Sequence, residues 1–421
     1  MSYQDESKPR FFYGWIVVAS CFICCFSYGP FYTLGVFFTT LQQEFGWSSA
    51  LTSSIHSLHL IIFIPSGILM GWLCDKYGPR RPMLLGAVFI GVGFCLLSQV
   101  NSLSQFYLFY AIASLGAGVI FAPPTSIVQK WFVKRSGLAL GIVVAGVGAS
   151  TLVYTPLAEH LISIYGWRTA YIQIGAGTAA LLILASLWAT TPEKKGLQPY
   201  GAQVLSQQWK ANEVVVEVGW SVREALRNKS VWFIAAIFFC TVFPIHMMIV
   251  HLVPFAQSIG MERDIAAWAL AIAGGVSILG RIITPTVAER TIGWRKGLIV
   301  VTAILAASFV WISQTASLWM LLVFAVVYGF CYGGKVPLIP ALIRSYFGVE
   351  SLGLLIGIVQ AVGGIGGAFG PLLAGYIVDV TGSYVIAFLI GAAFWALAAF
   401  FAWLSKPPKR KEIKYLIKQS R

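Results

Sequence analysis

Twelve separate runs of mostly apolar residues constrain the fold of this chain more than any other feature. An α-helix of about 20 residues crosses the hydrocarbon core of a bilayer and satisfies its own backbone hydrogen bonds there. Each run is long enough to form such a helix, and most of the turns between runs are short. The predicted spans cover residues 14–38, 50–73, 83–101, 105–128, 137–160, 168–189, 230–255, 263–288, 297–314, 317–343, 352–378 and 383–404.

The composition excludes a water-soluble protein. Hydrophobic residues make up 58% of the chain and charged residues only 10%, against roughly 25% charged residues in an ordinary soluble domain. Polar side chains are therefore too few to cover a globular surface. The alternating segments of about ten residues that build a membrane β-barrel are not seen. We therefore predict an all-α membrane protein.

The runs form two sets of six that repeat with an offset of 215 residues. Residues 78–81 (GPRR) correspond to residues 293–296 (GWRK), and Pro156 corresponds to Pro371. Parallel six-helix halves related by a pseudo-two-fold axis along the membrane normal are a known transporter architecture, with the substrate site in a central cavity between the halves. We predict an N-terminal half at 1–189, a cytoplasmic linker at 190–229, a C-terminal half at 230–404 and a basic cytoplasmic tail at 405–421.

The basic residues predict the orientation of the chain in the membrane. The net charge is +14, and 25 of the 29 Lys and Arg residues fall on one side of the predicted spans. Because Lys and Arg accumulate in cytoplasmic loops, both termini are expected in the cytoplasm. The protein itself is expected in the plasma (inner) membrane of the cell. The charge is thus explained by orientation, and no nucleic-acid partner is expected. The four exceptions are Arg168, Arg263, Arg281 and Lys335.

Residues 71–81 (GWLCDKYGPRR) lie between the second and third spans. In spacing and position they resemble the loop 2–3 signature of the major facilitator superfamily. This resemblance implies a conformational latch. Its carboxylate, Asp75, would accept hydrogen bonds from amides at a helix N-terminus and from Arg80 or Arg81.

Two further segments resemble a narrower family. Residues 13–18 (YGWIVV) open the first span and residues 131–141 (WFVKRSGLALG) open the fifth. Together they are similar to the monocarboxylate transporter family and its oxalate/formate antiporter relatives. Two positions depart from the family pattern. Ser277 stands where proton-coupled members usually carry an acidic residue, and the first span has Phe31, Tyr32 and Thr33 in the region where many members carry a lysine.

Two cations fall inside predicted spans, and no acidic residue falls deep inside one. A charge in hydrocarbon costs several kcal/mol, so Arg281 and Lys335 each need a partner. We expect that partner to be a bound anion. Guanidinium holds a carboxylate through two parallel hydrogen bonds, and the resemblance also implies that the arginine of span eight binds the substrate carboxylate. Ser277 shares a helix face with Arg281.

Other polar side chains are weaker candidates for the site. Tyr328, Tyr332 and Lys335 form a stripe along span ten that is expected to face the cavity. Lys335 would give a second carboxylate contact or a titrating group; the alternative is a lysine that extends to the inner membrane surface. Tyr32 of span one and His251 of span seven are further candidates for lining the site, and histidine can carry a proton near neutral pH.

We expect a secondary transporter of small monocarboxylates such as lactate or pyruvate, coupled to protons by symport. Exchange of carboxylates, as in oxalate/formate antiporters, is the alternative, and a non-transporting receptor is a third possibility. An exporter of cationic compounds is disfavoured because this sequence offers no buried carboxylate to hold a cation. No P-loop, nucleophile motif or metal cluster is present, so no enzyme activity, cofactor or metal site is expected. The expected partners are the carboxylate, a proton and the lipid bilayer, with the protein as a monomer.

Overall fold

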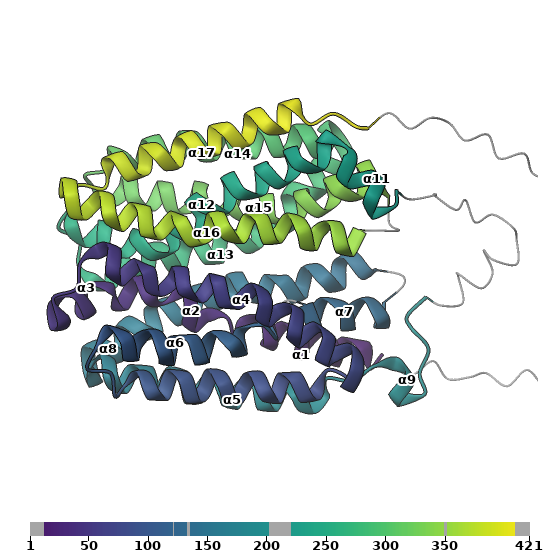
Figure 1. The fold of residues 1–421 in the computed structure, drawn as a ribbon, viewed down its shortest axis with the longest axis horizontal. Helices are drawn as coiled ribbons and strands as arrows, with labels where there is room; N and C mark the ends of the chain where they lie inside the picture. Colours follow the sequence, from purple (N-terminus) through teal and green to yellow (C-terminus); the bar gives the residue numbers. More distant parts are fainter. Residues whose placement is uncertain (1–11, 121, 133–134, 202–219, 349–351, 409–421) are drawn as a thin grey trace, which may run out of the picture.

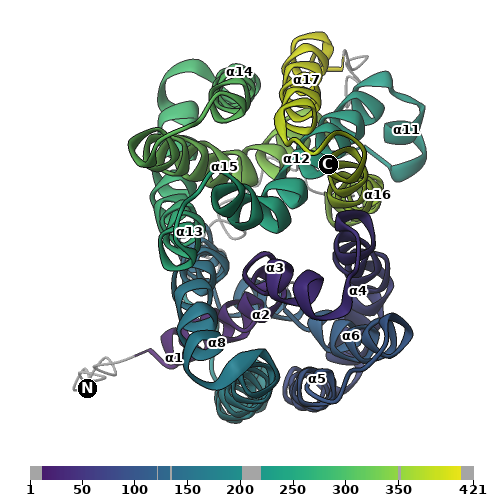
Figure 2. The same cartoon turned by 90° about the vertical axis from the view of Figure 1, so that its left-hand side faces the viewer.

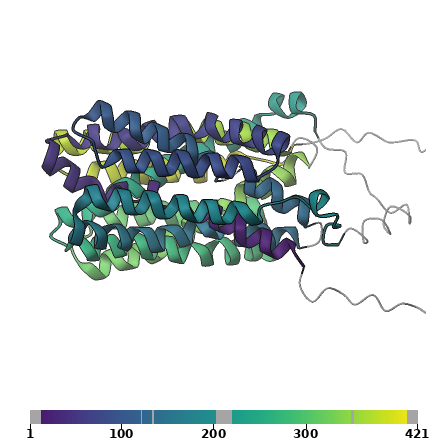
Figure 3. The same cartoon turned by 90° about the horizontal axis from the view of Figure 1, so that it is seen from below.

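The computed structural model describes residues 12–120, 122–132, 135–201, 220–348 and 352–408. The described chain is built from α-helices that run side by side along one direction (Figure 1). We call the end where residues 12, 201, 220 and 408 lie the terminal end, and the opposite end the far end. The view from below shows the same near-parallel bundle (Figure 3). An antiparallel helix bundle of this kind returns the chain to the same end after every second helix.

The N-terminal group of helices begins with a broken segment. Residues 14–45 form three consecutive helices that together make one stretch long enough to cross a membrane, and this stretch extends beyond residue 38, where the first predicted span ends. The break coincides with Gly29-Pro30, because proline lacks the amide that would continue the hydrogen-bond ladder. The helices of this group are α1 (Gly14–Phe26), α2 (Gly29–Tyr32), α3 (Leu34–Phe45), α4 (Ser49–Tyr77), α5 (Arg80–Leu97), α6 (Leu103–Ala117), α7 (Ala122–Trp131), α8 (Ser136–Trp188) and α9 (Pro192–Lys195).

The C-terminal group follows the predicted spans closely. Its helices are α11 (Val222–Arg227), α12 (Lys229–Ser258), α13 (Arg263–Val287), the π-helical turn η1 (Ala288–Ile292), α14 (Trp294–Ser313), α15 (Leu318–Phe347), α16 (Leu352–Thr381) and α17 (Val385–Leu404). Seen from the far end, α12–α17 lie together on one side and α1–α8 on the other (Figure 2). The groups meet where α13 contacts α8, where α16 contacts α4 and where α12 contacts α3.

Local sequence explains where several helices begin and end. The Ser48 side chain accepts a hydrogen bond from the Leu51 amide and caps α4, which ends at Gly78 with a positive φ of 83°. Gly293, its counterpart in the 215-residue repeat, has nearly the same backbone conformation, with φ at 79° and ψ at 158°. Inside α8, Gly166 has a φ of 78° and breaks the helical path.

The outer surface fits a lipid environment. Ten helical stretches among the described residues are long and apolar enough to cross a membrane. Many large hydrophobic side chains on them are exposed, with exposed tryptophans such as Trp188 and Trp403 near the terminal end and Trp268 and Trp319 near the far end. Tryptophan is enriched at the two membrane–water interfaces. The chain is therefore a multi-pass membrane protein.

Candidate functional site

Arg281 lies in the interior where α13 of one group crosses α8 of the other. Its side chain is only 8% exposed. Its Nη1 donates to the Val144 carbonyl oxygen, which belongs to α8. Among the described residues Arg281 has no ion pair, and its buried Nε has no hydrogen-bond partner. Within the described residues the Nε side of the guanidinium is therefore not used, and no printed contact occupies the Nε–Nη2 edge. That edge offers two parallel N–H groups, the geometry that binds a carboxylate.

Tyrosine rings lie beside this guanidinium. The Arg281 Cζ is 5.9 Å from the centre of the Tyr332 ring, and Tyr328 stacks on Tyr332 with ring centres 5.8 Å apart. Tyr32, from α2 of the other group, neighbours both Tyr332 and Arg281. The structure thus brings together Arg281, Tyr332 and Tyr32, three candidate residues that the sequence analysis took from three different spans. An aromatic face holds a cation through its quadrupole without cancelling its charge.

Lys335 is the second buried cation. It is 2% exposed, and its Nζ is 4.6 Å from the centre of the Phe238 ring of α12. Among the described residues no salt bridge involves it. Lys335 lies close enough to His246 to act on it electrostatically. The alternative that Lys335 extends to the membrane surface is not what the structure shows, because the side chain is enclosed.

Two nominated residues lie away from the guanidinium edge. The Ser277 hydroxyl donates to the Gly274 carbonyl oxygen and fills a tight crossing, where a Cβ added to Gly148 would meet its Oγ at 2.7 Å. His251 lies nearer the far end, where its Nε2 is 2.9 Å from the Pro371 carbonyl oxygen and 3.0 Å from the Ser53 hydroxyl. The structure therefore gives Ser277 a contact between helices and gives His251 a contact between the two groups.

One face of α4 is bonded to the C-terminal group over more than two turns, which the sequence did not indicate. At the far end the Ser49 and Ala50 amides donate to the Asp379 carboxylate of α16, at 2.6 and 2.8 Å. Further along α4, Ser53 contacts His251, His56 contacts His246, and the Ser57 hydroxyl donates to the Ala368 carbonyl oxygen. We call these four contacts the α4 row. Their spacing follows the helical repeat.

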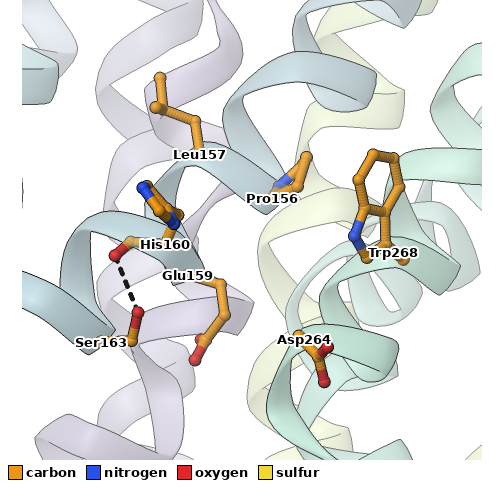
Figure 4. Close-up of a pocket in the computed structure, with 7 residues that line it drawn as sticks. All are labelled: Pro156, Leu157, Glu159, His160, Ser163, Asp264 and Trp268. Carbon is orange, nitrogen blue, oxygen red and sulfur yellow. Dashed lines mark hydrogen bonds between the residues drawn. The ribbon is translucent and has the colours of Figure 1, made fainter.

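A second connection between the groups lies at the far end beside a surface pocket. Arg263 of α13 forms a salt bridge with Glu159 of α8, with Nε 3.1 Å from Oε1, and donates to the Thr40 hydroxyl at 2.8 Å. Figure 4 shows Glu159 and Asp264 on facing helices around the pocket, with Trp268 at one side. Glu159 is the most buried carboxylate of the described chain at 6% exposure. The sequence placed it at a span end, where no partner in another span could be identified.

The loop between α4 and α5 differs from the prediction in one respect. Asp75 pairs with Lys130 of α7 at 3.6 Å, and no salt bridge joins it to Arg80 or Arg81 among the described residues. Arg81 instead lies over the Tyr77 ring, with Cζ 5.4 Å from its centre. Both α5 and α7 pack against α4, and it is Lys130 of α7 that reaches the carboxylate, whereas Arg81 is held over the Tyr77 ring.

No group of three or more His, Cys, Asp or Glu side chains within the described ranges is arranged to hold a metal ion. The buried charges in the centre are Arg281 and Lys335.

Comparison with known proteins agrees with this architecture. The chain is 25% identical over 451 residues to monocarboxylate transporter 12 of Rattus norvegicus, covering 99% of this chain and 90% of the relative. It is 27% identical to monocarboxylate transporter 13 of Rattus norvegicus (91% and 86% covered) and 25% identical to the oxalate:formate antiporter of Oxalobacter formigenes (98% and 95% covered).

Solved structures share the fold. A bacterial homologue of the human lysosomal transporter Spinster, in an inward-facing and occupied conformation, superposes with a TM-score of 0.73 at 15% identity, covering 93% of this chain and 96% of that one. The sequence pattern of the Major Facilitator Superfamily matches residues 20–315 and 286–419. The chain is therefore a transporter, without enzyme activity, that belongs to the major facilitator superfamily.

Proposed function

We propose that this protein is a proton-coupled symporter of small monocarboxylates of the lactate and pyruvate type, working by alternating access. The observation that carries the proposal is Arg281, an enclosed guanidinium that has, among the described residues, neither a partner for its Nε nor a salt bridge. A buried arginine needs an anion. A carboxylate on the Nε–Nη2 edge completes its hydrogen bonds, and the relatives named monocarboxylate transporters support that choice of ligand.

The proposal includes twelve spans in two six-helix halves, 1–189 and 230–404, joined by the linker 190–229 and followed by the tail 405–421. The break at Gly166 divides α8 into two helices, each long enough to span, and α6 with α7 supplies one further span. The matching backbone of Gly78 and Gly293 supports a two-fold repeat. The basic residues favour the terminal end as the cytoplasmic one.

Alternating access is supported by the distribution of contacts between the groups. The α4 row and the Arg263–Glu159 salt bridge hold the far end closed. With the terminal end in the cytoplasm, a closed far end would correspond to an inward-facing state. Rocking of the halves around Arg281 and Lys335 would then open the far end.

The proposal is tested by uptake of labelled L-lactate into liposomes that contain the purified protein. Inward proton gradients are compared with equal pH on both sides, with protein-free liposomes as the control. We expect accumulation that follows the gradient and disappears when a protonophore collapses it. Uptake that is the same with and without the proton gradient would contradict symport.

Carboxylate exchange is the second candidate, and Lys335 is the observation that favours it. Two buried cations suit a dianion better than a monoanion, and the oxalate:formate antiporter is similar over 98% of this chain. Exchange predicts little uptake into empty liposomes and rapid uptake into liposomes preloaded with oxalate or formate. Preloading therefore separates the two functions in one assay.

A further inference from the structure

The hydrogen bond between His56 and His246 differs from every other histidine contact in the described interior. The His56 Nε2 lies 2.9 Å from the His246 Nδ1, so two imidazole nitrogens share one proton across the boundary between the two groups. His56 is fully buried and its Nδ1 has no hydrogen-bond partner. His246 is half-buried. Either ring can donate in this bond, since each carries one acceptor and one donor nitrogen.

The hydrogen-bond partners of His59 determine which of its ring nitrogens carries the proton. The Ser114 hydroxyl donates to the Tyr110 carbonyl oxygen, so toward His59 it accepts, and the His59 Nδ1 must carry the proton. The His59 Nε2 then accepts from the Tyr28 hydroxyl. An added proton would therefore require the Tyr28 hydroxyl to change from donor to acceptor.

His251 is fixed in a similar way at its Nε2, because the Pro371 carbonyl oxygen can only accept. Its Nδ1 is buried without a partner, and the rings of Phe38 and Tyr384 lie on it at 5.3 and 5.6 Å between centres. A proton added there would lie on a single enclosed ring with no acceptor to share it. His246, by contrast, is partly exposed and has the second imidazole as acceptor.

We propose that the His56–His246 pair is the proton-binding site of the transport cycle, holding one excess proton across the two halves. The inference rests on the symport proposed above. The neutral pair holds two protons, one in the bridge and one on an outer nitrogen. An excess proton occupies the remaining outer nitrogen, one ring becomes imidazolium, and the bridge becomes a charge-assisted N–H⁺···N bond. A second excess proton would place N–H groups on both sides and break the bridge.

The surroundings of the pair explain why this proton is coupled to an anion. From α4 the neighbouring titratable group is His59, with ring centres 5.7 Å apart; from α12 it is His251, and from α15 it is Lys335. Lys335 adds positive charge to that of the protonated pair, and a bound carboxylate offsets both. Further titratable or charged groups on elements packed against α4 and α12 include Asp379 of α16, at the far end, Tyr384 at the start of α17, Tyr328 and Tyr332 of α15, Glu44 of α3, Tyr107 and Tyr110 of α6, Lys130 of α7, Arg80 and Arg81 of α5, and Arg263, Asp264 and Arg281 of α13.

The bridge also links proton binding to conformation. It is one of the contacts of the α4 row and breaks when the halves separate at the far end. Since a charge-assisted bond is stronger than a neutral one, an excess proton favours the closed far end. Loading from the far side followed by closure is the order that symport into the compartment at the terminal end requires.

The test compares His56→Gln and His246→Gln with wild type in liposomes. Glutamine can hydrogen-bond but does not titrate near neutral pH. Two assays are run: lactate counterflow at equal pH, which needs binding and rocking only, and accumulation driven by one pH unit, which one-to-one coupling limits to about tenfold. We expect both variants to retain counterflow and to lose gradient-driven accumulation, falling from about tenfold to about onefold. The exposed His160→Gln is the control and keeps both activities.

Accumulation retained in both variants would overturn this assignment and leave symport standing. Absence of gradient-driven accumulation in wild type would overturn symport and the assignment with it. If neither variant yields folded protein, nitrogen-15 NMR of histidine-labelled wild type decides. We expect lactate binding to add one proton to this coupled pair of rings, and signals that stay neutral while binding takes up a proton would overturn the assignment.

Discussion

The centre and the far end of the molecule use polar side chains in opposite ways. At the far end two carboxylates have partners in the other group: Asp379 caps α4 and Glu159 pairs with Arg263. In the centre, Arg281 and Lys335 are buried cations with no carboxylate beside them in the described chain. Carboxylates that have partners in the other group stabilise one arrangement of the halves, whereas cations without a partner are available to bind an anionic ligand. The difference separates a region that controls conformation from a region that binds.

Replacing Arg281 by lysine should have the largest effect on transport. Lysine keeps the charge but cannot present two parallel N–H groups to a carboxylate. The loss of one or more charged hydrogen bonds corresponds to about 100-fold in lactate uptake at subsaturating concentration. The matched control is Arg290→Lys, an exposed arginine just beyond α13, which should behave as wild type. Uptake by Arg281→Lys within threefold of wild type would contradict a two-point contact at this position.

The Asp379→Asn substitution should shift the conformational equilibrium. The carboxylate accepts two backbone amides at the start of α4, where the helix dipole favours negative charge. Removing the charge is expected to weaken the closed far end by about 1–2 kcal/mol, which is about tenfold in the ratio of open to closed forms.

Distances between spin labels on the two groups measure this shift. Ser104→Cys in α6 and Ala316→Cys before α15 are exposed positions at the far end. The native cysteines are buried or half-buried, which limits background labelling. We expect a second, longer distance in the Asp379→Asn protein. An unchanged distance distribution would show that this cap does not hold the far end closed.

The sequence predicts the fold well because membrane spans depend on local composition. Most helices begin and end within a few residues of the apolar runs, as α13 and α17 do. The break at Gly29-Pro30 and the division into α6 and α7 were missed, because hydropathy averages over a window and does not register a local backbone break. Both breaks lie inside runs that remain apolar throughout.

The candidate site was only partly predictable. Arg281 and Lys335 stand out from sequence because a charge in an apolar run is rare. The pairing of His56 with His246 joins residues 190 positions apart, and no helical spacing relates them. Ser277 shares a helix face with Arg281, but that face packs closely against α8 and α15, and the Ser277 hydroxyl donates to Gly274 of its own helix. Periodicity identifies a face of a helix but not which neighbour covers it.

The salt bridge between Arg263 and Glu159 should show coupling in a double-mutant cycle. Glu159 is buried, so removing Arg263 alone leaves a carboxylate without its cation, whereas removing both charges does not. We expect Arg263→Gln to lower the thermal stability of the purified protein by about 1–2 kcal/mol, discounted because Arg263 is itself 39% exposed. The double variant Arg263→Gln with Glu159→Gln should recover part of that loss. Additive losses would mean that the two side chains do not interact.

The smallest effect on stability is expected from Lys130→Gln at the terminal end. Its salt bridge with Asp75 is long at 3.6 Å, and the two side chains are 44% and 69% exposed, so water screens the attraction. The expected change in thermal stability is below about 1 kcal/mol. Because both residues belong to the N-terminal group, the distance between the spin labels at positions 104 and 316 should be the same in Lys130→Gln as in wild type. A shift of that distance as large as the one caused by Asp379→Asn would mean that contacts within one group also control the far end. The distinction between contacts within a group and contacts between groups would then be wrong.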